Sequence, residues 1–326
     1  MRSALKTTIL GLVASLGLTV AAAGVTARHL PITNHIALVA AAFSLYLIVV
    51  APLAVSVILV SLSRHWAVVT TAVALVVFSV FSQTGATRTI AAAPSRGITL
   101  RVMTANLRLG NADSNTLVRN ARDNADIFAV QELTPEAAQR LKAAGLEASF
   151  PYHFGYPVEG GGGTGLWSRY PLVSPTFVAG FQMVFISSRI ALPRWASDIP
   201  WVLVTHLSGP WPQAIKDWRG DIEALRRTMR STAKAAGHGA VVVVGDFNST
   251  LDMRPFRELL GEGYTDAGQS TGAPYLPTFP ADAAPVPPFL GIDHALLRNC
   301  TATAVRTIPQ LGSDHRALIV DVDLPK

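Results

Sequence analysis

The pattern of hydrophobic and polar positions divides this chain of 326 residues into two parts. Between positions 7 and 87 most residues are apolar, and the only Lys, Arg, Asp or Glu residues are Arg28 and Arg64. From Ile98 onward, short apolar runs alternate with amphipathic stretches, as strands alternate with helices in α/β proteins. The segment between the two parts is rich in Thr, Ser, Gly and Ala, which is typical of a linker. We predict a membrane segment over residues 1–87, a linker over 88–97 and a folded domain over 98–326.

Three stretches of the first part lack charged residues and approach or exceed the length that crosses the roughly 30 Å hydrocarbon core of a bilayer. They span about residues 7–27, 36–63 and 66–81. Pro52 lies in the second stretch, and a transmembrane helix tolerates such a proline as a kink. We therefore predict three transmembrane helices. The alternative for the first stretch is a cleavable signal peptide, because Arg2 and Lys6 precede it and Ala21-Ala22-Ala23 resembles a cleavage site.

The basic residues at the N-terminus also predict an orientation. Arg2 and Lys6 favour a cytoplasmic N-terminus, and three helices then place the remaining chain outside. If the first stretch is cleaved, the two remaining helices start outside and lead to the same side. The sequence thus predicts a multi-pass protein of the cell membrane, with the lipid bilayer as partner and the folded domain on the extracytoplasmic side.

The folded domain is predicted to alternate strands and helices. Residues 271–291 contain six prolines and are expected to be irregular. Strands are predicted at residues 98–104, 126–130, 166–168, 189–192, 201–205, 241–244, 296–297, 302–308 and 317–322, and helices at 114–124, from Thr134 to a cap at Gly145, at 212–236 and at 251–260.

Charge and cysteine content restrict the classes of partner. The formal net charge is +6, but the membrane segment contributes +4 of it through Arg2, Lys6, Arg28 and Arg64. The folded domain is therefore nearly neutral and has no run of Lys or Arg, which argues mildly against a nucleic-acid groove. Cys300 is the only cysteine, so an intrachain disulfide is impossible.

Polar residues gather at the ends of the predicted strands or in the adjacent turns. In open α/β folds this is where the chemistry is placed. Carboxylates such as Glu132 and Asp314 are hard oxygen ligands that suit Mg²⁺. The chain has no thiolate cluster and no His-Glu-x-x-His motif, so zinc is less favoured. The strand-end residues are Asn106, Glu132, Arg189, His206, Asp246 with Asn248, Asp293 with His294, and Asp314 with His315.

Seven short motifs occur in one order along the folded domain: TANL, VQE, SRYP, THL, GDFN, IDH and GSDH. Together they resemble the endonuclease/exonuclease/phosphatase superfamily, which has the deoxyribonuclease I-like fold. The resemblance covers about residues 98–322. It implies an α/β fold of the α+β four-layer sandwich type, with two packed mixed β-sheets flanked by helices. It also implies hydrolysis of a phosphoester with Mg²⁺, or alternatively Mn²⁺.

The resemblance assigns a role to each position that matches a motif. Glu132 is the expected metal ligand, assisted by Asn106 and Asp314. Asp246 is expected to orient or deprotonate the attacking water, and Asn248 to hold that water or the substrate phosphate. His315 would protonate the leaving oxygen or stabilise the transition state, with Asp293 fixing its tautomer. Two further matches are His206, as a second catalytic histidine, and Arg189, as a weaker match to a phosphate-contacting arginine.

Three functions remain open at this stage. The first is a membrane-anchored phosphoesterase that acts on a lipid headgroup or a small phosphoester. The second is an extracytoplasmic nuclease, with nucleic acid a less favoured partner because of the nearly neutral domain. The third is a catalytically silent membrane scaffold, which should have lost at least one metal or histidine position, and none is lost. No protein partner is predicted.

Overall fold

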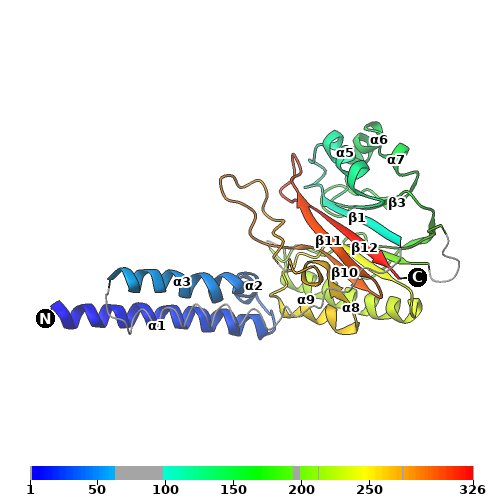
Figure 1. The fold of residues 1–326 in the computed structure, drawn as a ribbon. Coiled ribbons are helices and arrows are strands. Elements are labelled where there is room, and N and C mark those ends of the chain that lie inside the picture. Colours follow the sequence, from blue (N-terminus) through cyan, green and yellow to red (C-terminus); the bar gives the residue numbers. More distant parts are fainter. Residues whose placement is uncertain (1, 63–97, 194–198, 212, 274, 326) are drawn as a thin grey trace. The chain divides into compact units, whose positions relative to one another are not determined.

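The structure is a computed structural model that describes residues 2–62, 98–193, 199–211, 213–273 and 275–325 (Figure 1). The chain forms two compact units. The first, which we call the N-terminal unit, comprises Met1–Arg88 and Leu251–Arg257. The second, the sandwich unit, comprises Thr89–Thr250 and Glu258–Lys326.

Three helices account for the described N-terminal residues: α1 (Arg2–His29), α2 (His35–Ala42) and α3 (Ser44–Leu62). Glycines let α1 approach α3 closely, since a Cβ on Gly17 would lie 2.6 Å from a methyl carbon of Val55. The Asn34 side chain caps α2 by accepting a hydrogen bond from the Ala37 N–H at 2.8 Å. Pro52 stays inside α3.

The structure changes the prediction for the membrane segment. In residues 2–62, one helix, Gly11–His29, is long and apolar enough to cross a bilayer. The predicted second helix is broken at Phe43, where α2 and the following helix meet at 61°, so the described residues hold at most two spans. The predicted third helix and the linker lie outside the described residues. Three spans are thus not shown, and an N-terminal apolar helix fits a signal sequence as well as an anchor.

The sandwich unit contains two six-stranded mixed sheets. In each sheet one central pair of strands is parallel, β1 with β2 and β7 with β8, and the other pairs are antiparallel. Sheet A has the order β11 (Thr301–Ile308), β12 (Ala317–Leu324), β1 (Ile98–Asn106), β2 (Ile127–Gln131), β4 (Thr164–Ser168) and β3 (Tyr152–Tyr156). Sheet B has the order β5 (Leu172–Phe177), β6 (Ile186–Ile190), β7 (Trp201–His206), β8 (Val241–Asp246), β10 (Asp293–Arg298) and β9 (Thr265–Asp266).

Helices cover the outer faces of the sheets, which confirms the predicted sandwich of packed mixed sheets flanked by helices (Figure 1). An apolar cluster joins sheet A to α5 (Ser114–Asn124) and α6 (Pro135–Ala143), and α8 (Ile215–Ala236) lies along sheet B. The shorter helical elements are α7 (Leu146–Ser149), α9 (Arg254–Leu259), the 3₁₀ turn Leu260–Glu262 and α10 (Ala267–Ser270). Residues 271–291 are irregular, as predicted, apart from one bridge between Phe279 and Leu290.

The sequence missed β3, β5 and β9, and the reason is physical. β3 and β5 lie at sheet edges and have no buried residue, so they lack the alternation that marks a half-buried strand. Pro175 sits in β5, and an edge strand tolerates a proline because one side of it needs no ladder hydrogen bond. β9 has only two residues.

Substitution of one glycine in the sandwich core should destabilise the fold strongly. Gly245 in β8 has φ 146°, and a Cβ there would lie 1.9 Å from the Thr205 carbonyl oxygen on β7. Gly245→Ala should therefore lower the free energy of unfolding by about 3 kcal/mol or more, measured by denaturant titration. Gly220→Ala is the control, because it meets no atom within 4 Å on α8 and should stabilise by up to about 1 kcal/mol. Equal losses at both positions would contradict this account.

Candidate active site

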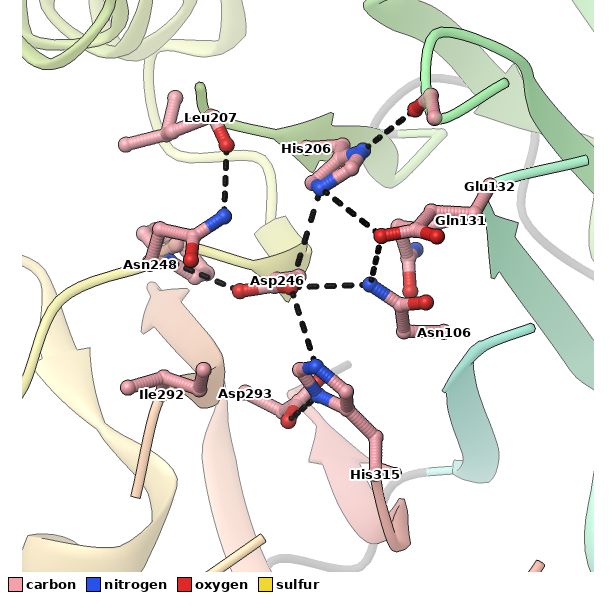
Figure 2. Close-up of polar contacts among 12 residues, drawn as sticks. Asn106, Gln131, Glu132, His206, Leu207, Asp246, Asn248, Ile292, Asp293 and His315 are labelled. Atoms are coloured by element: carbon pink, nitrogen blue, oxygen red, sulfur yellow. Dashed lines mark hydrogen bonds and ion pairs between the residues drawn. The ribbon is translucent and has the colours of Figure 1, made fainter. Parts of the chain in front are cut away.

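The inward-facing residues of the central strands change from apolar to polar at the edge where β1, β7 and β8 end and β10 begins. Along β8 the side chains of Val242 and Val244 pack between the sheets, and Asp246 takes the next inward position. The same period of two brings in Asn106 on β1, His206 on β7 and Asp293 on β10. Strand register then aligns them, because Asp246 pairs with His206 on one side and with Asp293 on the other. Figure 2 shows these side chains converging.

Asn106 links the two sheets. Its amide Nδ2 donates to Glu132 Oε1 at 3.1 Å and to Asp246 Oδ2 at 3.0 Å (Figure 2). Its Oδ1 accepts from the Arg108 N–H at 2.9 Å. The second Glu132 oxygen accepts from the Leu109 N–H. Two carboxylates from different sheets thus face the same amide group, where positive charge would stabilise both.

Asp246 is the centre of the cluster. Its Oδ1 accepts from the Asn248 N–H at 2.8 Å, and its Oδ2 lies 3.8 Å from Nε2 of both His206 and His315. Burial raises the pKa of the Asp246 carboxyl, and the neighbouring Asp293 charge raises it further, against the two histidines. A raised pKa brings a carboxylate nearer to the range in which it can act as a base at neutral pH.

His315 is held as a proton donor. Its Nδ1 lies 2.8 Å from Asp293 Oδ2, which leaves Nε2 directed toward Asp246. Burial alone would lower the pKa of His315, but the charges of Asp293 and Asp246 outweigh it and raise the pKa to about 10. At neutral pH the ring is therefore an imidazolium that can donate from Nε2. The adjacent His294 instead bonds Asp266 at 2.9 Å and has a structural role.

His206 is oriented by the four-glycine loop. Its Nδ1 lies 3.0 Å from the Gly161 carbonyl oxygen, so Nδ1–H donates and Nε2 faces Glu132 and Asp246. The loop is fixed to the sandwich, because the Gly163 carbonyl accepts from Leu133 at 3.0 Å and the Gly162 carbonyl accepts from Val184 at 2.9 Å. The sequence did not indicate this contact, since glycines alone do not reveal which side chain a loop will meet.

Two site residues have left-handed backbones. Glu132 has φ 57° and Asn248 has φ 46°. Asparagine tolerates this conformation, whereas for glutamate it costs on the order of 1 kcal/mol. The turn at Glu132 directs its carboxylate to Asn106, and the turn at Asn248 lets Nδ2 donate to the Leu207 carbonyl at 2.8 Å. Both left-handed positions thus serve the geometry of the cluster.

Asp314 lies at the margin of the cluster. Its Oδ2 is 3.9 Å from Arg108 Nε, and its side chain is 27% exposed. Burial raises the pKa of Asp314, and the Glu132 carboxylate contributes in the same direction. Arg108, which the sequence analysis did not single out, also pairs with Asp282 at 2.8 Å. Its position two residues after Asn106 was the available signal.

The structure does not bring Arg189 to this cluster. β6 is antiparallel to β7, and Arg189 pairs with Trp201 at the start of β7, whereas His206 is at its end. Its guanidinium lies over the Trp201 ring, 5.6 Å from the centroid. This placement corrects the expected phosphate contact. A strand end marks the site only for strands that run toward it, and β6 runs away.

Asp221 on α8 is a second residue that the sequence analysis missed. It is buried and accepts from the Ser208 N–H at 2.9 Å, the Ser208 hydroxyl at 2.7 Å and the Gln182 N–H at 3.0 Å. These bonds fix the turn that follows His206. Asp221→Ala should lower the free energy of unfolding by about 3 kcal/mol, because buried N–H donors lose a charged acceptor. Thermal and denaturant unfolding measure this, with the surface variant Asp123→Asn as control. A change below about 1 kcal/mol would contradict the bracing role.

The donors of the cluster fit a hard divalent cation. Asn106 turns its amide nitrogen to Glu132 and Asp246 and holds both carboxylates, Glu132 supplies carboxylate oxygens, and Asp314 lies near enough to Glu132 for their charges to interact. Such oxygens suit Mg²⁺. Asp246, Asp293 and His315 also have ligand atoms within 4.8 Å of one another. That second group fits less well, because Asp293 already holds Nδ1 of His315 and the His315 ring is protonated.

Comparison with known proteins agrees with this geometry. D. rerio TDP2 complexed with a single-strand DNA product is similar at TM-score 0.56 and 18% identity, over 69% of this chain and 99% of that chain. The 3′ phosphatase NExo from Neisseria, bound to a product DNA hairpin, gives 0.55 and 18%, with the same coverage. Sphingomyelinase C from Streptomyces griseocarneus gives 0.50 and 18%, also over 69% and 99%.

These likenesses show the fold. A search of curated protein sequences found no match. The profile of the Endonuclease/Exonuclease/phosphatase family matches residues 103–315, which is most of the sandwich unit and includes every residue of the cluster. The members of this superfamily are hydrolases that act on phosphoester bonds. The chain therefore belongs to the Endonuclease/Exonuclease/phosphatase family.

Proposed function

We propose that the protein is a metal-dependent phosphoesterase that hydrolyses the phosphodiester or phosphomonoester of a lipid headgroup or small molecule. One observation carries this proposal: Asn106, Glu132, His206, Asp246, Asn248, Asp293 and His315 form one connected cluster. A catalytically silent scaffold would not need two histidines and two left-handed turns that direct their side chains to the same cluster. Phosphoryl chemistry depends on positioning and charge stabilisation, which this cluster provides.

Asp246, at the end of β8, is suited to activate water. Asp246 Oδ2 would accept one proton of the water that attacks phosphorus. Asn106 Nδ2 holds that carboxylate at 3.0 Å, and the Asn248 N–H holds its other oxygen at 2.8 Å. The carboxylate is therefore oriented before substrate arrives. Asn248 would also hold the water or a phosphate oxygen.

The other proton transfer belongs to His315. As the bond from phosphorus to the leaving oxygen breaks, Nε2–H of His315 would donate to that oxygen. Asp293 keeps the ring charged and oriented through Nδ1 at 2.8 Å. His206, with Nε2 between Glu132 and Asp246, would stabilise a phosphate oxygen that becomes more negative in the transition state.

Mg²⁺, or alternatively Mn²⁺, would be held by Glu132 with help from Asn106 and Asp314. When bound, it supplies Lewis-acid polarisation of a phosphate oxygen and neutralises the developing charge. Glu132 and Asp246 face the same amide group of Asn106, an arrangement that positive charge would stabilise.

We also propose that α1 anchors the enzyme in the cell membrane and that the sandwich unit acts on the extracytoplasmic side. The support is the apolar stretch Gly11–His29 together with the basic residues that precede it. Protease added to intact cells should digest the sandwich unit if this is correct. Protection until the cells are broken would contradict the sidedness.

The experiment that tests the catalytic proposal is a substrate panel with the purified full chain in detergent and Mg²⁺. The panel contains a soluble generic phosphodiester, a soluble phosphomonoester, phospholipid vesicles and plasmid DNA. Turnover of a lipid or soluble ester that chelation abolishes would support the proposal. Cleavage of DNA alone would favour a nuclease. No turnover by folded, metal-loaded protein would overturn the proposal.

A further inference from the structure

Three loops begin or end beside residues of the catalytic cluster, and each exposes one large aliphatic side chain. The side chains are Leu109, Val286 and Leu311, which are 54%, 51% and 69% exposed. They are the large aliphatic side chains exposed to this extent in the described part of the sandwich unit. We call them, with their loops 107–113, 280–288 and 309–313, the apolar rim. Elsewhere in this unit, exposed large apolar residues are aromatic.

The three loops are connected to one another in a ring. Arg108 pairs with Asp282 at 2.8 Å, which joins the first loop to the second. The Ala281 N–H donates to the Asp314 carbonyl at 2.6 Å, which joins the second loop to the turn that follows the third. The Asp113 N–H donates to the Leu311 carbonyl at 2.8 Å, which joins the third loop to the first. The rim is therefore one connected surface.

The ring also contacts catalytic residues. The Leu109 N–H donates to Glu132, and the Phe279 ring lies 5.0 Å from that of His315. Thr278, just before this loop, lies with its Oγ1 3.4 Å from the Asp293 N–H. Each loop of the rim thus begins or ends within a few residues of a catalytic side chain.

The second loop is built to enter an apolar medium. Its tip, from Ala283 to Pro288, carries no charged or hydrogen-bonding side chain. Three of these six residues are prolines, which lack an N–H, and the Val286 N–H donates to the Ala283 carbonyl at 2.8 Å. Few backbone donors of the tip would therefore need water, which lowers the cost of placing irregular backbone in lipid. Figure 1 shows the segment that precedes β10, in brown, projecting from the sandwich as a loop.

The charge of the rim distinguishes a bilayer from nucleic acid. Its loops contain one basic residue, Arg108, and two acidic residues, Asp113 and Asp282. Arg108 is paired with Asp282, so the rim offers no free positive charge to a phosphate backbone. Nucleic-acid grooves need several Lys or Arg residues, and single-strand binders add aromatic platforms. An exposed aliphatic rim around a polar centre instead matches the interface of a membrane.

We infer that the apolar rim inserts into the interfacial layer of a lipid bilayer and presents a lipid-borne phosphoester to the catalytic cluster. This inference rests on the proposed function for its substrate and names the bilayer as the occupant of the rim. It differs from anchoring by α1, because the rim acts beside the reacting group. A headgroup phosphate would reach the polar centre while the aliphatic side chains contact the acyl region below it.

A quenching experiment on the full chain in phosphatidylcholine vesicles tests the insertion. Val286→Cys is labelled with an environment-sensitive fluorophore, and Ala235→Cys on the exposed face of α8 is the control. The native Cys300 is buried and burial raises the pKa of its thiol to about 12, so the label goes to the introduced cysteine. Nitroxide-labelled lipid should quench the probe at 286 at least about twofold more than the probe at 235. Equal quenching at both positions would overturn the inference.

A second measurement links insertion to catalysis. Val286→Asp should lower turnover of vesicle phospholipid, relative to a soluble phosphodiester, by about tenfold, because a carboxylate replaces an apolar group that enters lipid. An unchanged ratio would also overturn the inference. The quenching readout needs no turnover, so it decides the rim even if the enzyme hydrolyses nothing. Failure of the proposed function and failure of the rim are therefore separate results.

Discussion

Asp246→Asn should lower kcat by roughly 1,000-fold or more on whichever phosphoester the protein hydrolyses. The asparagine fills the same space but cannot accept a proton from water, and loss of a general base costs about 10²–10⁴-fold. The variant also removes the negative charge that lies 3.8 Å from the two histidine Nε2 atoms. Its loss should lower the pKa of His315, so the proton donor is weakened as well.

The measurement is turnover of the soluble diester by full-length protein at saturating Mg²⁺. Asp123→Asn is the matched control, because that carboxylate is exposed on α5 and paired only with its neighbour Arg122 in the described contacts. The control should keep wild-type activity. If Asp246→Asn retained more than about a tenth of the wild-type kcat while folded, Asp246 would not be the base, and the assignment of the cluster would have to change.

Glu132→Gln should raise the Mg²⁺ concentration for half-maximal activity at least about tenfold and lower kcat roughly 100-fold or more. The amide keeps the shape of the side chain and one oxygen acceptor for Asn106 Nδ2, but loses the charge that favours a divalent cation. Removal of metal by chelation should abolish the activity of the wild type and of the variant. Added Mg²⁺ should restore the activity of the wild type at a lower concentration than that of the variant.

Glu136→Gln provides the control for this prediction. It lies four residues further along, exposed in the first turn of α6, and its substitution should change neither constant. Calorimetric titration of Mg²⁺ gives a readout that needs no substrate. The affinity for Mg²⁺ measured in this way should fall only in Glu132→Gln. Unchanged metal affinity in that variant would place the metal elsewhere, with the group formed by Asp246, Asp293 and His315 as the next candidate.

Local sequence determined much of the sandwich. Consecutive valines indicate a buried strand such as β8, and the predicted start of α5 at residue 114 is confirmed. The structure shows that the residue just before this start, Asp113, caps the helix, because its side chain accepts from the Thr116 N–H at 2.8 Å. The exposed edge strands β3 and β5 carry no such signal, because alternation requires one buried face. The order of motifs along the chain also indicated the family.

The sequence showed that each polar residue lies at the end of a strand. It did not show at which of the two edges of the sheet that strand end lies. His206 and Asp246 meet because β7 and β8 are parallel and end at the same edge of sheet B, and Asn106 at the end of β1 joins them from sheet A by its hydrogen bond to Asp246. Arg189 follows the same local pattern and lies at the opposite end, since β6 is antiparallel. Strand direction is fixed by pairing between distant segments, which no local pattern contains.

The sequence by itself thus determined which residue types are present, the period of two that turns each strand from core to site, and an apolar helix at the N-terminus. Only the tertiary structure decided that Gly161 orients His206, that Asp221 fixes the turn after it, and that Leu109, Val286 and Leu311 share one rim. These contacts join residues that lie from 13 to 198 positions apart along the chain. Their partners are chosen by chain topology, and topology follows from the packing of the whole sandwich.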